Sequence, residues 1–455
     1  MRKLLIISSV FLFVGQLKAQ NNLTLYNMKP VPQRMAINPA FTPTCKWYFG
    51  TPILSSIDFS FNSRVIGLSE LSDALVSNTD GSNYTLDMTK LSNVFSNGVS
   101  VNSTYNQEWL SLGFRLRKSM LSFSINEKLK SRVFLPQDFF RLVFEGNGGD
   151  NVGEIFNLGF GVDFIHTREF AVGYSRSFID EKLRIGGRIK YIAGINAIQT
   201  ERNDLLFETS EKAFTYYLKS DIKFNSSLTP IDSNSTLNSI LFGNQQNRGF
   251  GIDIGANLKL NKKLSVSASI IDLGVVRWRD NLKTTFTKNP GVYHEYRGMD
   301  IQDFLGDSAN QKKGFETFKD TLMEIIALDT SSESFNTGLL GEFYVGGNLH
   351  ITKNHNIGAL MYGSFYKKEF YPALTLSWNS QIGRVLALSA SYTMYRKSYM
   401  NLGFGAALKL GPEQFYISTD NAIGSVTDNT RNLGVHFGWN HIFGKKRNKK
   451  VSCDL

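Results

Sequence analysis

Charged side chains recur at every second position of otherwise apolar segments, and these are the residues whose spacing could do chemistry. In the segment 183–191, Arg184, Arg188 and Lys190 share one face, and the residues between them are largely apolar. Such a row inside a sheet-built channel could select a solute, or it could pair across strands and fill the interior. We favour the paired interior, because acidic positions are spread among the basic ones. The predicted lumen-lining residues are Arg115, Asp163, Arg184, Arg188, Lys190, Asp253, Lys259, Glu342 and Lys409.

Motifs for enzymatic chemistry are absent from the sequence. There is no HExxH, GxSxG, phosphate-binding loop or paired CxxC, and the six histidines are scattered. His441 falls on the apolar register of the last segment, between Trp439 and Phe443, where a lipid-modifying enzyme could place a catalytic histidine. Without a serine partner nearby, we favour an interfacial histidine. The sequence therefore predicts no enzyme, no cofactor and no metal site.

The elements that must position these charges are strands. From 250 to 260 the even positions are apolar and the odd ones are small, polar or charged, and similar segments of about ten residues follow one another from 341 to the end. A soluble sandwich and a membrane barrel both fit this alternation. Short connections such as 261–263 alternate with long polar ones such as 279–335, which favours a barrel.

The sequence therefore predicts an all-β fold: a transmembrane antiparallel up-and-down β-barrel over 47–443, with a few short helices in loops or plug. We expect about 14 strands, with about 16 as the alternative, because such barrels have even counts. The lower count treats 205–224 as an external hairpin beyond the barrel. Aromatic residues at strand ends are predicted to form the interfacial girdle: Trp47, Trp278, Tyr392, Trp439 and Phe443.

The N-terminus has the layout of an export signal. Residues 1–19 combine a basic start, an apolar stretch too short to span a bilayer, and Ala19 at the expected cleavage position. The cell outer membrane is therefore the predicted location. Cys45 and Cys453 are the only cysteines. In an oxidising compartment they could pair, and two unpaired thiols explain them equally well.

The net charge of +11 does not indicate a nucleic-acid partner. Arg2, Lys3 and Lys18 lie in the predicted signal, and residues 444–455 carry five basic residues against one acid, so the rest is nearly balanced. A nucleic-acid binder would spread its basic excess over a patch or helix. The predicted partners are outer-membrane lipid and periplasmic or secretion-system proteins, with 444–455 as a basic periplasmic tail.

Several short motifs carry a resemblance. The segment 32–43, PQRMAINPAFTP, places Asn38 and Pro39 in a turn before the first strand, and SIIDLG at 269–274 and QFYISTDN at 414–421 follow. In combination they resemble a family of Bacteroidota outer-membrane β-barrels known only as a domain of unknown function. The family is similar to fatty-acid-transporter-like barrels and to the Por-type barrels of type IX secretion. The resemblance implies that 20–46 is an N-terminal plug or periplasmic segment containing Asn38 and Pro39.

Two functions remain open from the sequence. The first is permeation or uptake of small or amphipathic solutes. The alternative is a non-transporting partner barrel of a type IX secretion or gliding complex. A lumen blocked by residues 20–45 and by paired charges would favour the partner role, whereas a continuous or laterally open path would favour transport.

Overall fold

The computed structural model describes most of the chain. The described residues are 23–63, 75–77, 84–96, 98–212, 215–229, 246–296, 327–339, 341–366, 369–395, 398–422 and 432–445. The predicted signal at 1–19 lies outside these residues, as do Cys453 and all but the first two residues of the predicted tail.

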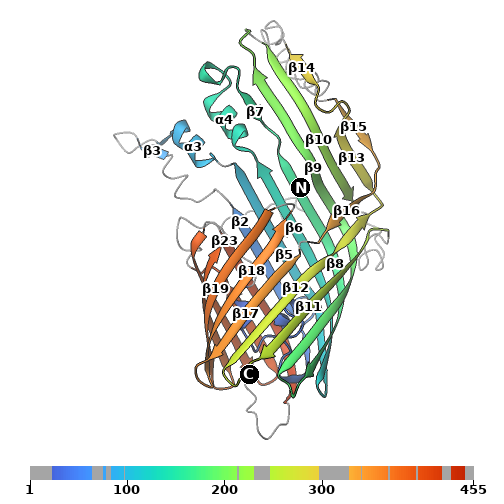
Figure 1. The fold of residues 1–455 in the computed structure, drawn as a ribbon, viewed down its shortest axis with the longest axis vertical. Helices are drawn as coiled ribbons and strands as arrows, with labels where there is room; N and C mark the ends of the chain where they lie inside the picture. Colours follow the sequence, from blue (N-terminus) through green and yellow to red (C-terminus); the bar gives the residue numbers. More distant parts are fainter. Residues whose placement is uncertain are drawn as a thin grey trace, which may run out of the picture.

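A closed antiparallel barrel with fourteen strand positions forms the body of the molecule (Figure 1). In spatial order the positions hold β1 (Cys45–Gly50) together with β2 (Ser56–Ser63), β5 (Val99–Leu116), β6 (Ser119–Leu135), β8 (Gly161–Phe178), β9 (Leu183–Thr209), β11 (Arg248–Lys259), β12 (Leu264–Trp278), β17 (Glu342–His350), β18 (His355–Tyr366), β19 (Glu369–Ile382), β20 (Leu386–Tyr395), β21 (Ser398–Leu410), β22 (Glu413–Thr419) and β23 (Asn432–Lys445). β23 pairs with both β1 and β2, which closes the barrel. The prediction of a barrel of about 14 strands is confirmed.

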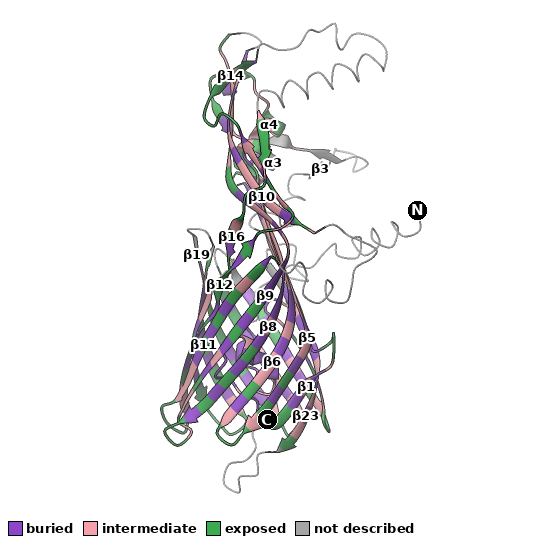
Figure 2. Ribbon diagram, turned by 90° about the vertical axis from the view of Figure 1, so that its right-hand side faces the viewer, coloured by how far each residue is buried: buried purple, intermediate pink, exposed green. Residues whose placement is uncertain are grey.

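Buried and exposed residues alternate along the barrel strands (Figure 2), and this alternation separates an apolar outer face from a polar interior. On β11, Phe250, Ile252 and Ile254 are 49%, 37% and 54% exposed, whereas Asp253 between them is fully buried. Large apolar residues are therefore turned outward, and charged and small residues are turned inward. In a soluble protein the arrangement is reversed, because large apolar residues are buried and charged residues are exposed.

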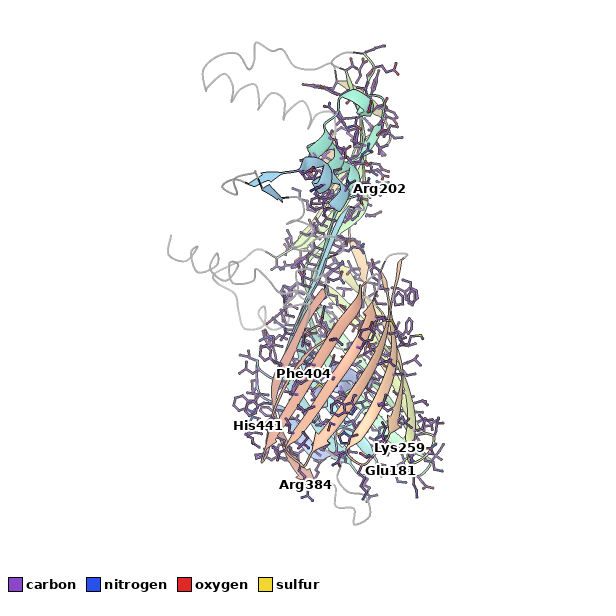
Figure 3. The ribbon with its side chains drawn as sticks, turned by 90° about the vertical axis from the view of Figure 1, so that its left-hand side faces the viewer. Glu181, Arg202, Lys259, Arg384, Phe404 and His441 are labelled. Carbon is purple, nitrogen blue, oxygen red and sulfur yellow. The ribbon has the colours of Figure 1, made fainter. Side chains whose placement is uncertain are left out.

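Tight turns gather at one end of the barrel. They connect β5 to β6, β8 to β9, β11 to β12, β17 to β18, β19 to β20, and β21 to β22. Arg117, Gly383 and Gly411 adopt positive φ in three of these turns, at 51°, 61° and 64°. We call this end the short-turn end. Figure 3 shows Lys259, Glu181 and Arg384 there.

At the opposite end, several strands continue past the barrel rim. β9 pairs with β11 over 183–193 and then leaves the barrel to pair with β10 (Tyr216–Leu228) over 196–209. This pairing confirms the predicted external hairpin. The other elements of this extension are β7 (Ile155–Asn157), β13 (Leu282–Thr287), β14 (Tyr293–Tyr296), β15 (Leu328–Ser331), β16 (Phe335–Gly338), α3 (Met88–Val94), α4 (Gln137–Glu145) and the short helix η3 (Gly149–Asn151). β3 (Leu75–Ser77) and β4 (Tyr84–Leu86) form a separate two-stranded sheet.

Candidate functional site

Residues 23–44 lie inside the barrel, and we call this segment the plug. It contains two short 3-10 helices, η1 (Leu25–Asn27) and η2 (Pro32–Ala36), with Pro32 at the first position of η2. Its apolar residues pack against inward wall residues: Leu23, Leu25, Tyr26, Met28, Val31, Ile37 and Phe41 meet Ile271, Tyr344, Leu360, Tyr362, Ala373, Ala387, Ala407 and Tyr416. The Tyr26 ring stacks on Tyr344 with centroids 5.8 Å apart. The plug thus supplies a hydrophobic core to a lumen whose wall is mostly polar.

Side-chain hydrogen bonds fasten the plug to the wall. The backbone amides of Leu23 and Thr24 donate to the Asp420 carboxylate at 2.9 and 2.7 Å. Gln33 Nε2 donates to Asn440 Oδ1 at 2.7 Å, and Asn440 Nδ2 donates back to Gln33 Oε1 at 3.0 Å. No strand ladder joins the described plug residues to the wall. A displacement of the plug would therefore break none of the hydrogen bonds that pair the barrel strands.

Asn38 and Pro39 touch the wall where two glycines make room. Asn38 Nδ2 lies 3.3 and 3.2 Å from the carbonyl oxygens of Ala256 and Ala268. A Cβ added at Gly255 would stand 2.1 Å from Asn38 Oδ1, and one added at Gly186 would stand 2.4 Å from the Pro39 carbonyl oxygen. This close approach requires glycine on the wall.

A buried cluster of charges lines one side of the lumen. Lys190 Nζ lies 2.7 Å from Asp253 Oδ1 and also contacts Asp272, and Lys128 Nζ lies 3.0 Å from Glu169 Oε2 and 3.1 Å from Asp272 Oδ2. Its members come from five adjacent strands, β6, β8, β9, β11 and β12: Lys128, Lys130, Glu169, Arg188, Lys190, Asp253 and Asp272. Each charge lies within 4 Å of an opposite charge, which offsets the cost of burial.

Other predicted lumen residues lie apart from this cluster. Arg115 Nε donates to the Cys45 carbonyl oxygen at 3.1 Å, which ties the wall to the end of the plug. Glu342 accepts the Tyr344 hydroxyl at 2.7 Å. Arg184 and Lys409 are half-buried on inward positions nearer the short-turn end.

Two predicted lumen residues lie elsewhere. The Asp163 carboxylate accepts a hydrogen bond from the Thr200 backbone amide at 3.0 Å. Both residues lie beyond the point where β9 leaves the barrel, so the assignment of Asp163 to the lumen is wrong. A bulge between His166 and Thr167 also breaks the register there. Lys259 ends β11 with an exposed side chain, beyond the packed interior.

The sequence analysis missed four members of this cluster: Lys128, Lys130, Glu169 and Asp272. Asp272 interrupts an apolar run, Ile270 to Leu273, and its φ of 56° marks a bulge in β12. The polar residue in an apolar run was the only signal available, because the pairing of five strands cannot be read from spacing.

The same bulge corrects the prediction for Trp278. Before Asp272 the even positions of β12 face outward, and after it the odd ones do. Trp278 is therefore fully buried, and its Nε1 donates to Thr337 Oγ1 at 2.9 Å. Its assignment to the aromatic girdle is wrong.

The remaining girdle residues lie on the outer face. Trp47 is 41% and Tyr392 is 37% exposed. The Trp47 ring stacks on Phe443 with centroids 4.0 Å apart, and Trp439 stacks on Phe415 at 5.4 Å. These pairs lie near the pairing of β23 with β1, where the barrel closes, and we call this junction the seam.

His441 links three strands at this seam, low on the barrel in Figure 3. Its Nδ1 lies 2.9 Å from Glu413 Oε1, and its Nε2 lies 3.2 Å from the Thr51 hydroxyl. Glu413 also accepts Trp439 Nε1 at 2.6 Å. These contacts join β22, β23 and the end of β1, and we interpret them as closing the seam.

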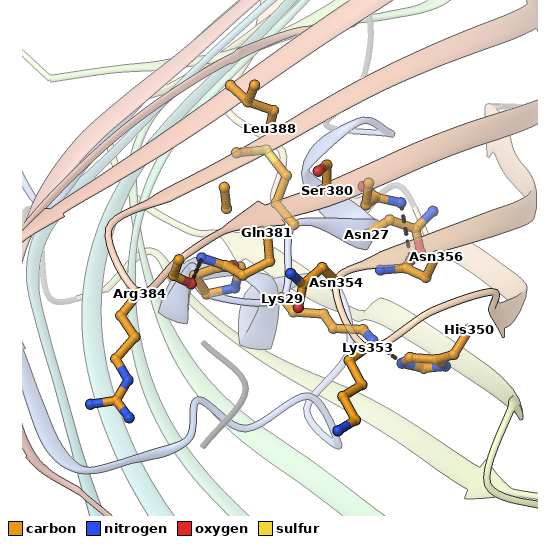
Figure 4. Close-up of a pocket in the computed structure, with 15 residues that line it drawn as sticks. Asn27, Lys29, His350, Lys353, Asn354, Asn356, Ser380, Gln381, Arg384 and Leu388 are labelled. Carbon is orange, nitrogen blue, oxygen red and sulfur yellow. Dashed lines mark hydrogen bonds between the residues drawn. The ribbon is translucent and has the colours of Figure 1, made fainter. Parts of the chain in front are cut away.

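A basic pocket opens between the plug and the wall at the short-turn end (Figure 4). Its volume is about 380 Å³, within the range of small-molecule sites. Lys29, His350, Lys353 and Arg384 line it with the amides of Asn27, Asn354, Asn356, Asn379 and Gln381, and no lining residue is acidic. His350 Nδ1 lies 3.2 Å from the Lys263 carbonyl oxygen, so Nδ1 donates there and Nε2 accepts from Lys29. Lysine, arginine and amide donors suit an anionic group.

The described residues hold no group of three or more histidine, cysteine, aspartate or glutamate side chains arranged for a metal. Cys45 is a buried free thiol where the plug ends, and its predicted partner Cys453 lies outside the described residues. No helix in the described part of the chain is long and apolar enough to cross a membrane.

Comparison with known proteins gives one sequence family and several solved barrels. The profile of a family described as "Family of unknown function (DUF5723)" matches residues 39–420. No curated protein matches the chain. A Pseudomonas aeruginosa FadL homologue is 10% identical, with a TM-score of 0.44 over 94% of this chain and 95% of that one. The Pseudomonas putida toluene transporter TodX is 8% identical, with a TM-score of 0.41 over 95% and 97%. At these scores neither bears on what this chain binds.

Proposed function

The chain belongs to the DUF5723 family of unknown function, and we propose that it is an outer-membrane barrel that takes up small or amphipathic solutes past a movable plug. The outward apolar face and the closed sheet support a bilayer setting, because a barrel without edges satisfies its backbone hydrogen bonds internally. Outer-membrane barrels keep short turns on the periplasmic side, so the extension would lie outside the cell.

The attachment of the plug carries this proposal. The segment is held to the wall by hydrogen bonds that each involve a side chain, such as those of Thr24 with Asp420 and of Gln33 with Asn440. Its backbone–backbone hydrogen bonds all lie within the plug. A plug of this kind can shift while every strand of the wall stays paired. The basic pocket lies beside the plug at the periplasmic end, where a solute that had passed the plug would leave.

The basic pocket beside the plug predicts that the protein prefers anionic solutes to neutral ones, and this preference can be measured. We expect vesicles containing the protein to take up gluconate faster than glucose, which has similar size and no charge. Lys353→Gln with Arg384→Gln should lower gluconate uptake by about tenfold and leave glucose unchanged, because the two cations raise the local anion concentration. Lys182→Gln with Lys262→Gln, at two other short turns, is the charge-matched control. If the wild-type protein admits neither solute nor any current, the uptake proposal is abandoned.

A second candidate is a non-transporting barrel that anchors a partner, such as a component of a type IX secretion or gliding complex. The filled lumen and paired charges favour it, as does the long extension beside the rim. Cross-linking in native membranes followed by purification in mild detergent would recover a stable partner. A barrel that elutes alone would count against this candidate.

A further inference from the structure

Four lysines gather on two neighbouring turns at the short-turn end. Lys182 lies in the turn from β8 to β9, Lys259 ends β11, and Lys262 and Lys263 lie in the turn from β11 to β12. The Lys259 amide donates to the Lys182 carbonyl oxygen at 2.8 Å, which holds the two turns side by side. We call these four residues the turn lysine patch.

The turn lysine patch is a local excess of positive charge. All four lysines are exposed, and none of them forms an ion pair with a described residue. Asp180 and Glu181 precede Lys182 in its turn, whereas no acidic residue lies between Asp253 and Asp272 in the sequence. The turn from β11 to β12 therefore carries positive charge alone, which suits it to an anionic partner.

The patch lies at one edge of the apolar band on the outer wall. Leu260 is 53% exposed and shares the outward register of β11 with Phe250, which is 49% exposed. With a rise of about 3.3 Å per residue and a strand tilt of about 40°, the distance from Phe250 to Leu260 along the barrel axis is about 25 Å. That is the height of the apolar band of an outer-membrane barrel, so Lys262 and Lys263 lie at the level of the lipid headgroups.

Apolar side chains of the next two strands border the same lysines. Val266 on β12 is 38% exposed, and Leu349 on β17 is 46% exposed. Leu264 pairs directly with Leu349 across the β12–β17 ladder, so these outward residues are continuous with the turn. An anion held by the lysines therefore has a hydrocarbon-binding wall beside it, which matches a phospholipid better than an acidic soluble protein.

We propose that the turn lysine patch binds the phosphate group of an anionic phospholipid in the membrane leaflet that faces the short turns. The acyl chains of this lipid lie along Leu260, Val266 and Leu349. The inference rests on the membrane setting of the proposed function but not on uptake through the lumen, because no lysine of the patch lines the basic pocket.

The test measures binding to the full chain in detergent by native mass spectrometry, with phosphatidylglycerol, phosphatidylethanolamine and glycerol phosphate as ligands. The wild type should bind phosphatidylglycerol about tenfold more tightly than phosphatidylethanolamine, because the amine of the second lipid cancels its phosphate charge. Lys259→Gln/Lys262→Gln/Lys263→Gln should bind the two lipids equally. The corresponding triple arginine variant keeps the charge and should retain the preference.

The matched control removes the same charge from the extension. Lys212→Gln/Lys283→Gln/Lys288→Gln replaces three exposed lysines far from the short turns and should bind phosphatidylglycerol as the wild type does. An equal loss of affinity in this control would overturn the proposal, because the effect would then be one of total charge. An unchanged preference in the triple glutamine variant of the patch would also overturn it.

Two further outcomes separate this inference from its alternatives. Glycerol phosphate that competes as strongly as phosphatidylglycerol would assign the patch to free phosphate esters and reject the lipid. Heat-modifiable migration on a gel checks that each variant is a closed barrel, and its failure in the triple glutamine variant would contradict the surface role argued here. Selective phosphatidylglycerol binding by a barrel that takes up no solute would support this inference while rejecting the uptake proposal.

Discussion

Removing residues 23–44 is expected to turn a barrel whose lumen is filled by the plug into an open pore. The single-channel conductance in planar bilayers should rise at least about tenfold. Barrels of eight strands are filled by their own side chains, whereas those of 16 to 18 strands hold water. At fourteen positions this barrel needs the plug core, including Tyr26 and Phe41, to fill its lumen. The wall should survive, because no described plug residue takes part in its strand pairing.

Two controls decide how that result is understood. Heat-modifiable migration must show that the shortened chain still forms a barrel. Asp420→Asn keeps the plug but weakens its contact with the amides of Leu23 and Thr24, so its conductance should lie between those of the two proteins. A shortened barrel that conducts no better than the full chain would mean that other residues close the lumen.

Lys190→Met is expected to lower the free energy of unfolding by about 3–5 kcal/mol, because it leaves buried carboxylates without their central cation. Lys190 contacts both Asp253 and Asp272, and its side chain is 2% exposed. Urea titration of the barrel in lipid vesicles measures the loss.

The matched control lies in the same cluster. Lys130 approaches Asp272 at 3.6 Å and is 24% exposed, so Lys130→Met should cost less than about 1 kcal/mol. Adding Asp272→Asn to Lys190→Met should restore part of the stability, because one uncompensated charge is removed. Equal losses in the two single variants would show that the cluster does not depend on burial and pairing as described.

The barrel could be predicted from the sequence because its signal is local. Alternation, as at 250–260, needs only two neighbouring residues to define an inside and an outside. The strand count was harder, since β1 and β2 share one position and extension strands such as β10 show similar patterns. Trp278 was misplaced because a single bulge residue, Asp272, exchanges the faces of the strand.

The charge cluster and the basic pocket depend on contacts between residues far apart in the chain, which the spacing of residues along the sequence does not reveal. Lys190 was predicted to face inward, yet its partner Asp272 is 82 residues away on the second strand along the sheet. The basic pocket joins Lys29 of the plug to Arg384 of a turn, and only the folded barrel brings them together. The resemblance to barrels of unknown function implied a plug that contains Asn38 and Pro39, but it did not indicate which wall residues contact the plug.

The most direct measurement of the central claim locks the plug to the wall and releases it again. Asn38→Cys removes the Oδ1 that would stand 2.1 Å from a Cβ at Gly255, and that Cβ would lie 2.9 Å from the present position of Asn38 Cγ. Asn38→Cys with Gly255→Cys, in a Cys45→Ser/Cys453→Ser background, should therefore form a disulfide. If the plug gates the lumen, gluconate uptake by vesicles falls to the protein-free background under oxidation and returns on reduction. Unchanged uptake through the oxidised, fully cross-linked protein would contradict the account.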